Sequence, residues 1–70
     1  MLKFENKANG RYYYVIVKRD ILNDLVLTII RGSCKQRREF SRGGFNADDM
    51  QQEIKRITKR RLQRGYEIIN

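Results

Sequence analysis

The sequence predicts an α+β fold, in which a small antiparallel β-sheet packs against one C-terminal α-helix. Runs rich in β-branched and aromatic residues come first along the chain, and the clearest helical pattern follows them. With 70 residues the chain forms one domain, 1–70, close to the smallest size that supports a core of its own. An antiparallel sheet with one helix across one face is the simplest arrangement that buries both apolar surfaces.

Four segments have the composition of strands, and a short fifth is expected at the C-terminus. The four are 2–6 (LKFEN), 11–19 (RYYYVIVKR), 24–31 (DLVLTIIR) and 35–41 (KQRREFS). The segments KANG, DILND and RGSC read as turns between them, and SRGG reads as the loop that leaves the fourth strand. Consecutive strands joined by short turns most simply pair as antiparallel hairpins.

Both faces of the two central strands are apolar. Alternation in 11–19 sets Tyr13, Val15 and Val17 on one face and Tyr12, Tyr14 and Ile16 on the other. The next strand likewise separates Leu25, Leu27 and Ile29 from Val26, Thr28 and Ile30. One face of this sheet is expected to meet the core, and the other is unusually apolar for a surface in water.

The helix is predicted to begin after Asn46, a good N-cap, with Asp48 and Asp49 at the positive end of its dipole. Phe45 and Met50 have the spacing of a hydrophobic staple. The expected apolar stripe consists of Ala47, Met50, Ile54 and Ile57. Gly65 is placed to end the helix as its C′ residue, and 66–69 (YEII) has strand character.

The charge is strongly unbalanced, with 16 Lys and Arg against 8 Asp and Glu, a formal net charge of +8. The corresponding isoelectric point, about 10.2, is typical of nucleic-acid-binding domains. Anionic membranes and acidic proteins attract the same charge, so it indicates a class of partner. The simpler alternative is that these cations only keep the surface soluble.

Nothing in the sequence favours catalysis, and we expect no enzyme activity, cofactor or metal. The chain has no histidine, the usual proton carrier near neutral pH. Cys34 is its one cysteine, with neither a base nor an orienting third group evident, and it reads as an incidental thiol in a turn. The start MLKFENKANG lacks the apolar core of a signal peptide, so a cytoplasmic location is expected.

Two groups of cations are the candidate nucleic-acid-binding residues. The first belongs to the predicted hairpin and its exit loop: Arg31, Lys35, Arg37, Arg38 and Arg42. The second belongs to the helix: Arg56, Lys59 and Arg60. After Glu53 the helix carries only positive charge, and like charges four residues apart repel by a few tenths of a kcal/mol. A partner that supplies anions would explain this pattern, although charged runs are usually solvated helix faces.

Arg61 falls inside the apolar stripe of the helix, and a structural role is expected for it. Either its stem lies on the core while the guanidinium extends past the helix end, or the guanidinium reaches a carboxylate or carbonyl under the sheet. The tyrosines at 12–14 lie among the cations, and tyrosines can stack on bases or sugars. For at least two of the three, a place in the core or on the sheet is the more usual role.

In order and spacing these segments resemble the WGR domain, a family named for a Trp-Gly-Arg triplet. Its members occur in poly(ADP-ribose) polymerases and as small bacterial proteins. The resemblance spans nearly the whole chain, and its main markers are Arg11-Tyr12-Tyr13 and the Gly65-Tyr66 pair that follows Arg61. At the triplet positions this chain has Arg31-Gly32-Ser33, so it retains only the glycine.

The resemblance implies an antiparallel sheet packed with one helix, in agreement with the residue patterns. It also implies DNA binding, since in the polymerases the domain takes part in binding damaged DNA near a strand end. Arg31, in place of the tryptophan, can stack its planar guanidinium on a sugar or base, or pair with a phosphate.

The leading hypothesis is therefore a non-enzymatic module that binds nucleic acid, DNA rather than RNA, mainly through phosphates. The alternative is a protein-interaction or self-associating adaptor module, a homodimer for example, because the central strands are apolar on both faces. Attachment to an anionic membrane is the least favoured, because the core needs the apolar stripe of the helix.

Overall fold

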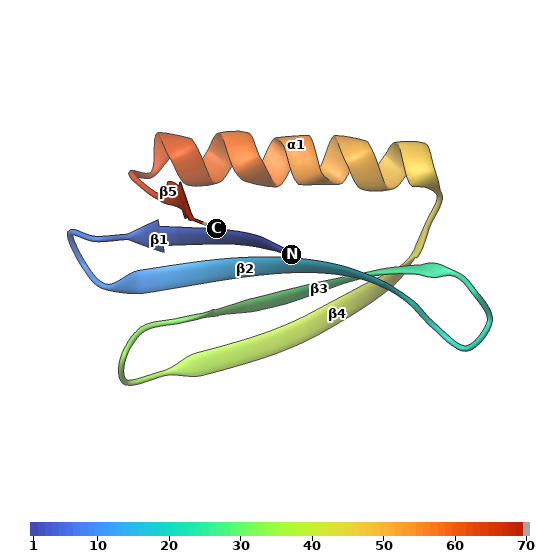
Figure 1. The fold of residues 1–70 in the computed structure, drawn as a ribbon, viewed down its shortest axis with the longest axis horizontal. Coiled ribbons are helices and arrows are strands. Elements are labelled where there is room, and N and C mark those ends of the chain that lie inside the picture. The colour runs from blue at the N-terminus through green and yellow to red at the C-terminus, as the bar shows by residue number, and fades with distance from the viewer. Residues whose placement is uncertain (70) are drawn as a thin grey trace.

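The computed structural model describes residues 1–69 and contains a five-stranded antiparallel sheet and one helix. The elements are β1 (Leu2–Asn6), β2 (Arg11–Arg19), β3 (Leu25–Gly32), β4 (Arg37–Phe45), α1 (Ala47–Gln63) and β5 (Glu67–Ile69). The strand order is β4-β3-β2-β1-β5, and α1 runs lengthwise along one side of the sheet (Figure 1). This arrangement confirms the predicted α+β fold, including the short fifth strand, which pairs with β1.

The core lies between α1 and the face of the sheet that we call the inner face. The strand register places Phe4 opposite Tyr13 and Val15 opposite Ile29. These alternate residues of neighbouring strands therefore point to the same face, beneath the helix. The buried apolar residues are Phe4, Tyr13, Val15, Leu27, Ile29, Met50 and Ile57. Met50 and Ile57 are buried as the helical stripe predicted, and Ile54 packs against the core partly buried. Ala47 was also expected in the stripe but is exposed, at the first position of the helix.

Strand β4 is longer than the sequence predicted, and residues 41–44 belong to it instead of forming an exit loop. Pairing with β3 continues past an irregularity to Phe45, which lies opposite Leu25. Gly44 has a φ of 82°, a conformation that glycine adopts easily and that lets a bulge form without ending the strand. Arg42 therefore projects from a strand, opposite Leu27, and the turn before β4 is restricted to residues 33–36.

Both ends of α1 are capped as predicted. The Asn46 side chain accepts a hydrogen bond from the Asp49 backbone N–H, with 2.8 Å between the two atoms. At the other end Gly65 has a φ of 86°, and the backbone N–H of Tyr66 donates to the carbonyl of Arg61, as in a Schellman motif. The buried Asn6 side chain donates to the carbonyl of Arg64 at 3.3 Å, which ties the C-terminus of the helix to β1.

The opposite face of the sheet, the outer face, has no helix over it. The rings of Tyr12 and Tyr14 lie there with centroids 5.0 Å apart, and both are half-buried. Thr28 is buried on this face, where its hydroxyl shares a 2.9 Å hydrogen bond with that of Ser41. Within residues 1–69, no helix is both long and apolar enough to cross a membrane.

Candidate nucleic-acid interface

A groove of about 430 Å³ lies between α1 and the inner face of strands β2, β3 and β4. We call it the basic groove. It is lined by Tyr13, Leu27, Ile29, Arg31, Phe40, Ser41, Arg42, Glu53, Arg56, Ile57, Arg60 and Arg61. The groove exists because the helix does not cover β4, on which every residue before Phe45 is exposed. Its floor is apolar and its walls carry guanidinium groups.

A second hollow, of about 300 Å³, adjoins the groove at the β3–β4 turn and the C-terminal end of α1. It shares Tyr13, Arg31 and Arg61 with the groove. It is further lined by Arg11, Tyr12, Gly32, Ser33, Gln36, Arg38, Arg64 and Tyr66. The two hollows together present eight arginines and one acid, Glu53. The excess positive charge of this chain is thus concentrated on one side of the sheet.

The structure brings together five of the eight predicted site residues and leaves three apart. Those that line the groove or the second hollow are Arg31, Arg38, Arg42, Arg56 and Arg60. Arg37 alternates with Arg38 and so takes the outer face, where it pairs weakly with Glu39 at 4.0 Å. Lys35 lies in the exposed turn, and Lys59 is turned about 200° around the helix from the buried Ile57.

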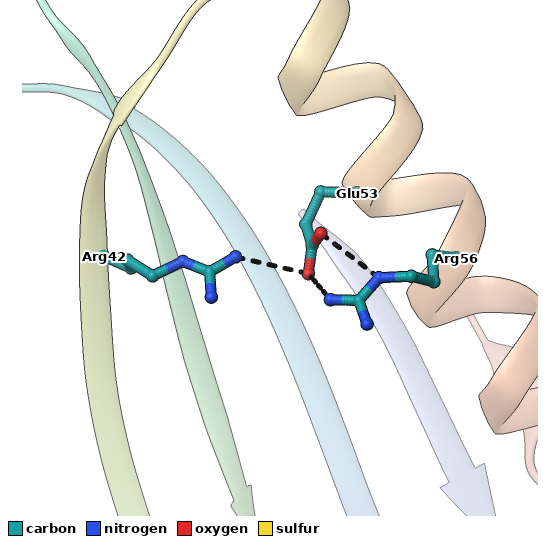
Figure 2. Close-up of polar contacts among 3 residues, drawn as sticks. All are labelled: Arg42, Glu53 and Arg56. Carbon is teal, nitrogen blue, oxygen red and sulfur yellow. Dashed lines mark hydrogen bonds and ion pairs between the residues drawn. The ribbon is translucent and has the colours of Figure 1, made fainter.

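Glu53 is the acid of the groove, and its carboxylate is shared by two arginines from different elements (Figure 2). Arg42 reaches it from β4, with 3.4 Å between Nη2 and Oε1, while Arg56 reaches it from the next turn of α1. The hydrogen bond to Glu53 raises the pKa of Arg56 above its ordinary value, so the guanidinium stays charged. The Glu53 side chain is only 16% exposed, and it occupies a position that two cations converge on.

Arg61 lies where the groove meets the second hollow, and its guanidinium contacts two aromatic rings. Its central carbon is 4.5 Å from the ring centroid of Tyr13 and 5.4 Å from that of Tyr66. The predicted structural role is therefore supported by packing on aromatic rings. Its Nε atom is buried and has no hydrogen-bond partner among residues 1–69, although a buried donor normally has one. Arg61 thus has hydrogen-bonding capacity that the described part of the chain leaves unused.

Two more arginines on this side of the sheet are held against aromatic rings. Arg31 lies over Phe40, 5.5 Å from the ring centroid, and Arg42 lies over Phe45 at 5.1 Å. Arg31 also stands directly opposite Arg38 across the β3–β4 ladder. Like charges in directly opposed positions destabilise a sheet, and a bound anion would relieve that repulsion.

Sequence reasoning missed three residues of this surface as site residues: Arg11, Arg61 and Arg64. Arg11 is two residues from Tyr13 in the same strand, so both side chains lie on the same face of the sheet. This spacing would have indicated Arg11 once the face that carries Tyr13 was known to be the inner one. Arg64 follows Ile57 by seven residues, two helical turns, and therefore shares its side of the helix. Among the tyrosines, Tyr13 is a core residue, while Tyr12 and Tyr14 stand on the outer face.

Within residues 1–69, no group of three or more acidic or cysteine side chains is placed to hold a metal ion. Cys34 is a free, exposed thiol in the turn between β3 and β4. Comparison of the chain with models of known families, with curated proteins and with solved structures gave no match.

Proposed function

We propose that this chain is a non-enzymatic, WGR-like nucleic-acid-binding module, and that DNA rather than RNA is its partner. The observation that carries the proposal is the gathering of eight arginines around two adjoining hollows that contain a single acid. Arginine is suited to such a partner, since its planar fork binds phosphate oxygens in pairs and also stacks on rings. The resemblance of the chain to WGR domains supports the same class of partner.

The electrostatic cost of this arrangement also supports an anionic partner. Arg31 faces Arg38 across the sheet, and Arg56, Arg60 and Arg64 follow one another at intervals of four residues along one side of the helix. Such neighbours repel when no anion lies between them. A surface that only served solubility would gain more from mixed signs. Phosphates in the hollows would convert these repulsions into attractions.

The proposed binding mode is contact with phosphates, with little base-pair specificity. If four to six phosphates of a duplex are neutralised, a plot of log affinity against log salt should have a slope of about −4 to −5. The cytoplasm is the compartment we propose for this activity.

The test is fluorescence anisotropy with blunt duplex DNA, a closed dumbbell without ends, and single-stranded RNA, each at two salt concentrations. The proposal requires binding at low salt that weakens steeply as salt rises. The choice of DNA over RNA is tested separately, by tighter binding of single-stranded DNA than of single-stranded RNA of the same length and label. Tighter binding of the open duplex than of the dumbbell would show that the chain also recognises the ends of DNA strands. Binding that does not respond to salt, or no binding at low salt, would contradict the proposal.

A second candidate function, self-association or adaptor binding, is favoured by the outer face. Its centre consists of half-buried apolar side chains with no element above them: Tyr12, Tyr14, Ile16, Val26 and Ile30. Burial of such a face against a second copy would remove apolar area from water. Sedimentation at several concentrations tests this: a dimer that Tyr14→Lys dissociates supports it, and a strict monomer contradicts it.

A further inference from the structure

We propose that the basic groove binds an unpaired nucleobase, stacked on Phe40, so that single-stranded nucleic acid is the preferred ligand of this surface. This inference rests on the proposed function and makes it more specific, because it names the part of a nucleic acid that enters the groove. Its features are the apolar floor, the exposed aromatic ring on the groove wall and the guanidinium groups around them.

The floor of the groove is apolar, which phosphate binding alone does not require. Leu27, Ile29 and Ile57 form it, and all three are buried members of the core. A surface that only contacts phosphates needs cations and backbone N–H groups, and gains nothing from an apolar floor. A nucleobase has an apolar π-face that favours such surroundings. The groove therefore combines a place for a flat ring with a place for the charge attached to it.

Phe40 is the exposed aromatic ring of the groove. It lies opposite Ile29 in the β3–β4 pairing, so its side chain points to the inner face, and it is 47% exposed. A phenylalanine this exposed on an edge strand loses the benefit of burial and presents a ring edge and face to a ligand. Arg31 lies over the same ring, with its guanidinium 5.5 Å from the centroid. A base placed against Phe40 would thus have a cation beside it to meet the adjoining phosphate.

Size and charge select a nucleotide among the possible occupants. The groove, at about 430 Å³, lies within the range of small-ligand pockets. Arg31, Arg60 and Arg61 stand at its walls without an acidic partner among residues 1–69, since Glu53 pairs only with Arg42 and Arg56. An uncharged apolar ligand would leave these three guanidinium groups unmatched, whereas a nucleotide supplies both a ring and an anion.

The experiment compares two strands that carry the same number of phosphates. One is fluorescein-labelled dT12, and the other is a 12-unit strand of abasic tetrahydrofuran phosphodiesters with the same label. Because their charges match, a difference in affinity measures the contribution of the bases. We expect the full chain to bind dT12 about 10- to 100-fold more tightly, the range given by one or two base–aromatic stacks. A duplex of 12 base pairs is expected to bind more weakly than dT12.

Variants locate the effect. Phe40→Ala should bring the affinity for dT12 down to that for the abasic strand and leave the abasic affinity unchanged. Leu62→Ala is the matched control, because Leu62 is exposed to a similar extent, 49%, but lies outside the groove. It should keep the full preference for dT12. Retention of that preference in Phe40→Ala would overturn the proposal.

Phe40→Trp provides a second readout that does not depend on the stability of the alanine variant. The chain has no tryptophan, so the introduced indole is the sole reporter at the groove wall. Its fluorescence should be quenched by dT12 and not by the abasic strand. Base insertion would be overturned if neither strand quenched the indole, or if the unmodified chain bound both strands with equal affinity. In either case, binding that weakens with salt would still support the proposed function. Binding of neither strand would overturn base insertion, and the proposed function with it if the 12-base-pair duplex also failed to bind at low salt. A 12-residue poly-glutamate peptide that bound as tightly as dT12 would overturn both.

Discussion

Arg42 on the edge strand and Glu53 on the helix are joined across the basic groove by an ion pair of 3.4 Å (Figure 2). The same carboxylate also pairs with Arg56, so one half-buried acid holds two cations in place. These contacts bridge the inner face of β4 to α1. Glu53 therefore acts in two ways: it positions two arginines, and it occupies the place where a ligand anion would meet them.

Glu53→Gln should tighten nucleic-acid binding. The substitution frees Arg42 and Arg56 for phosphate contacts, so we expect affinity at 0.1 M salt to rise by about 3- to 10-fold and the salt dependence to steepen by one or two units. Anisotropy titrations at several salt concentrations measure both quantities. Glu39→Gln is the control, because it changes the net charge equally but on the outer face, beside Arg37. Its change in log affinity should be less than half of that caused by Glu53→Gln. Equal effects of the two variants would mean that only net charge matters.

Arg61→Met should separate binding from stability. Methionine keeps an apolar stem between Tyr13 and Tyr66 and removes a buried Nε that lacks an acceptor. The lost cation–π contacts and the relieved donor are of similar size, so the free energy of unfolding should change by less than about 1 kcal/mol. Affinity should fall, and the salt slope should become shallower by about one unit. Urea denaturation and anisotropy measure the two effects; a large loss of stability with unchanged affinity would show that Arg61 is purely structural.

Gly32→Ala should destabilise the hairpin between β3 and β4. A Cβ added at Gly32 would lie 2.0 Å from the backbone carbonyl oxygen of Gln36, so the turn would have to shift. We expect a loss of about 1–3 kcal/mol in the free energy of unfolding, as for other forced overpacking. Gly43→Ala is the control, because its nearest neighbour is 3.9 Å away, and its stability should be equal or slightly higher. Equal stability of the two variants in urea denaturation would contradict this account of Gly32.

Asn6→Ala should loosen the C-terminal end of the helix. The Asn6 side chain donates to the carbonyl of Arg64 and accepts from the backbone N–H of Ala8, at 3.3 and 3.0 Å. Because both partly buried hydrogen bonds are lost, unfolding should become easier by about 1–2 kcal/mol in chemical denaturation. Asn9→Ala removes a single exposed bond to Arg11 and should cost no more than about 0.5 kcal/mol. A smaller effect at position 6 than at position 9 would contradict the proposed anchoring.

The fold was largely predictable, because strand alternation and helix caps are local signals. Residues 11–19 form the predicted strand with the same limits, and Asn46 and Gly65 cap the helix as expected. The end of β4 was not predictable in the same way. Ser-Arg-Gly-Gly has the composition of a loop, and only pairing with β3 across a bulge keeps it in the sheet.

The candidate site was predictable only in part, since it depends on which strand face the helix covers and how far. The pattern of charges indicated the hairpin and the helix, but alternation sends Arg38 and Arg37 to opposite faces. The pattern of charges also could not show that α1 leaves β4 uncovered, and this uncovered strand is what opens the groove. Arg11, far from both cationic segments in the sequence, joins the site because β2 lies next to β3.

The central claim, that the arginines around the groove bind nucleic acid, is tested most directly by two triple variants of equal charge. The first replaces Arg31, Arg38 and Arg60 with glutamine, and the second replaces Arg37, Lys55 and Lys59, which lie outside both hollows. At 0.1 M salt, where each lost phosphate contact weakens binding several-fold, the first should lower affinity by about 100-fold or more and the second by less than about fivefold. Similar losses in the two variants would contradict the claim and leave only a diffuse attraction of a basic protein for an anion.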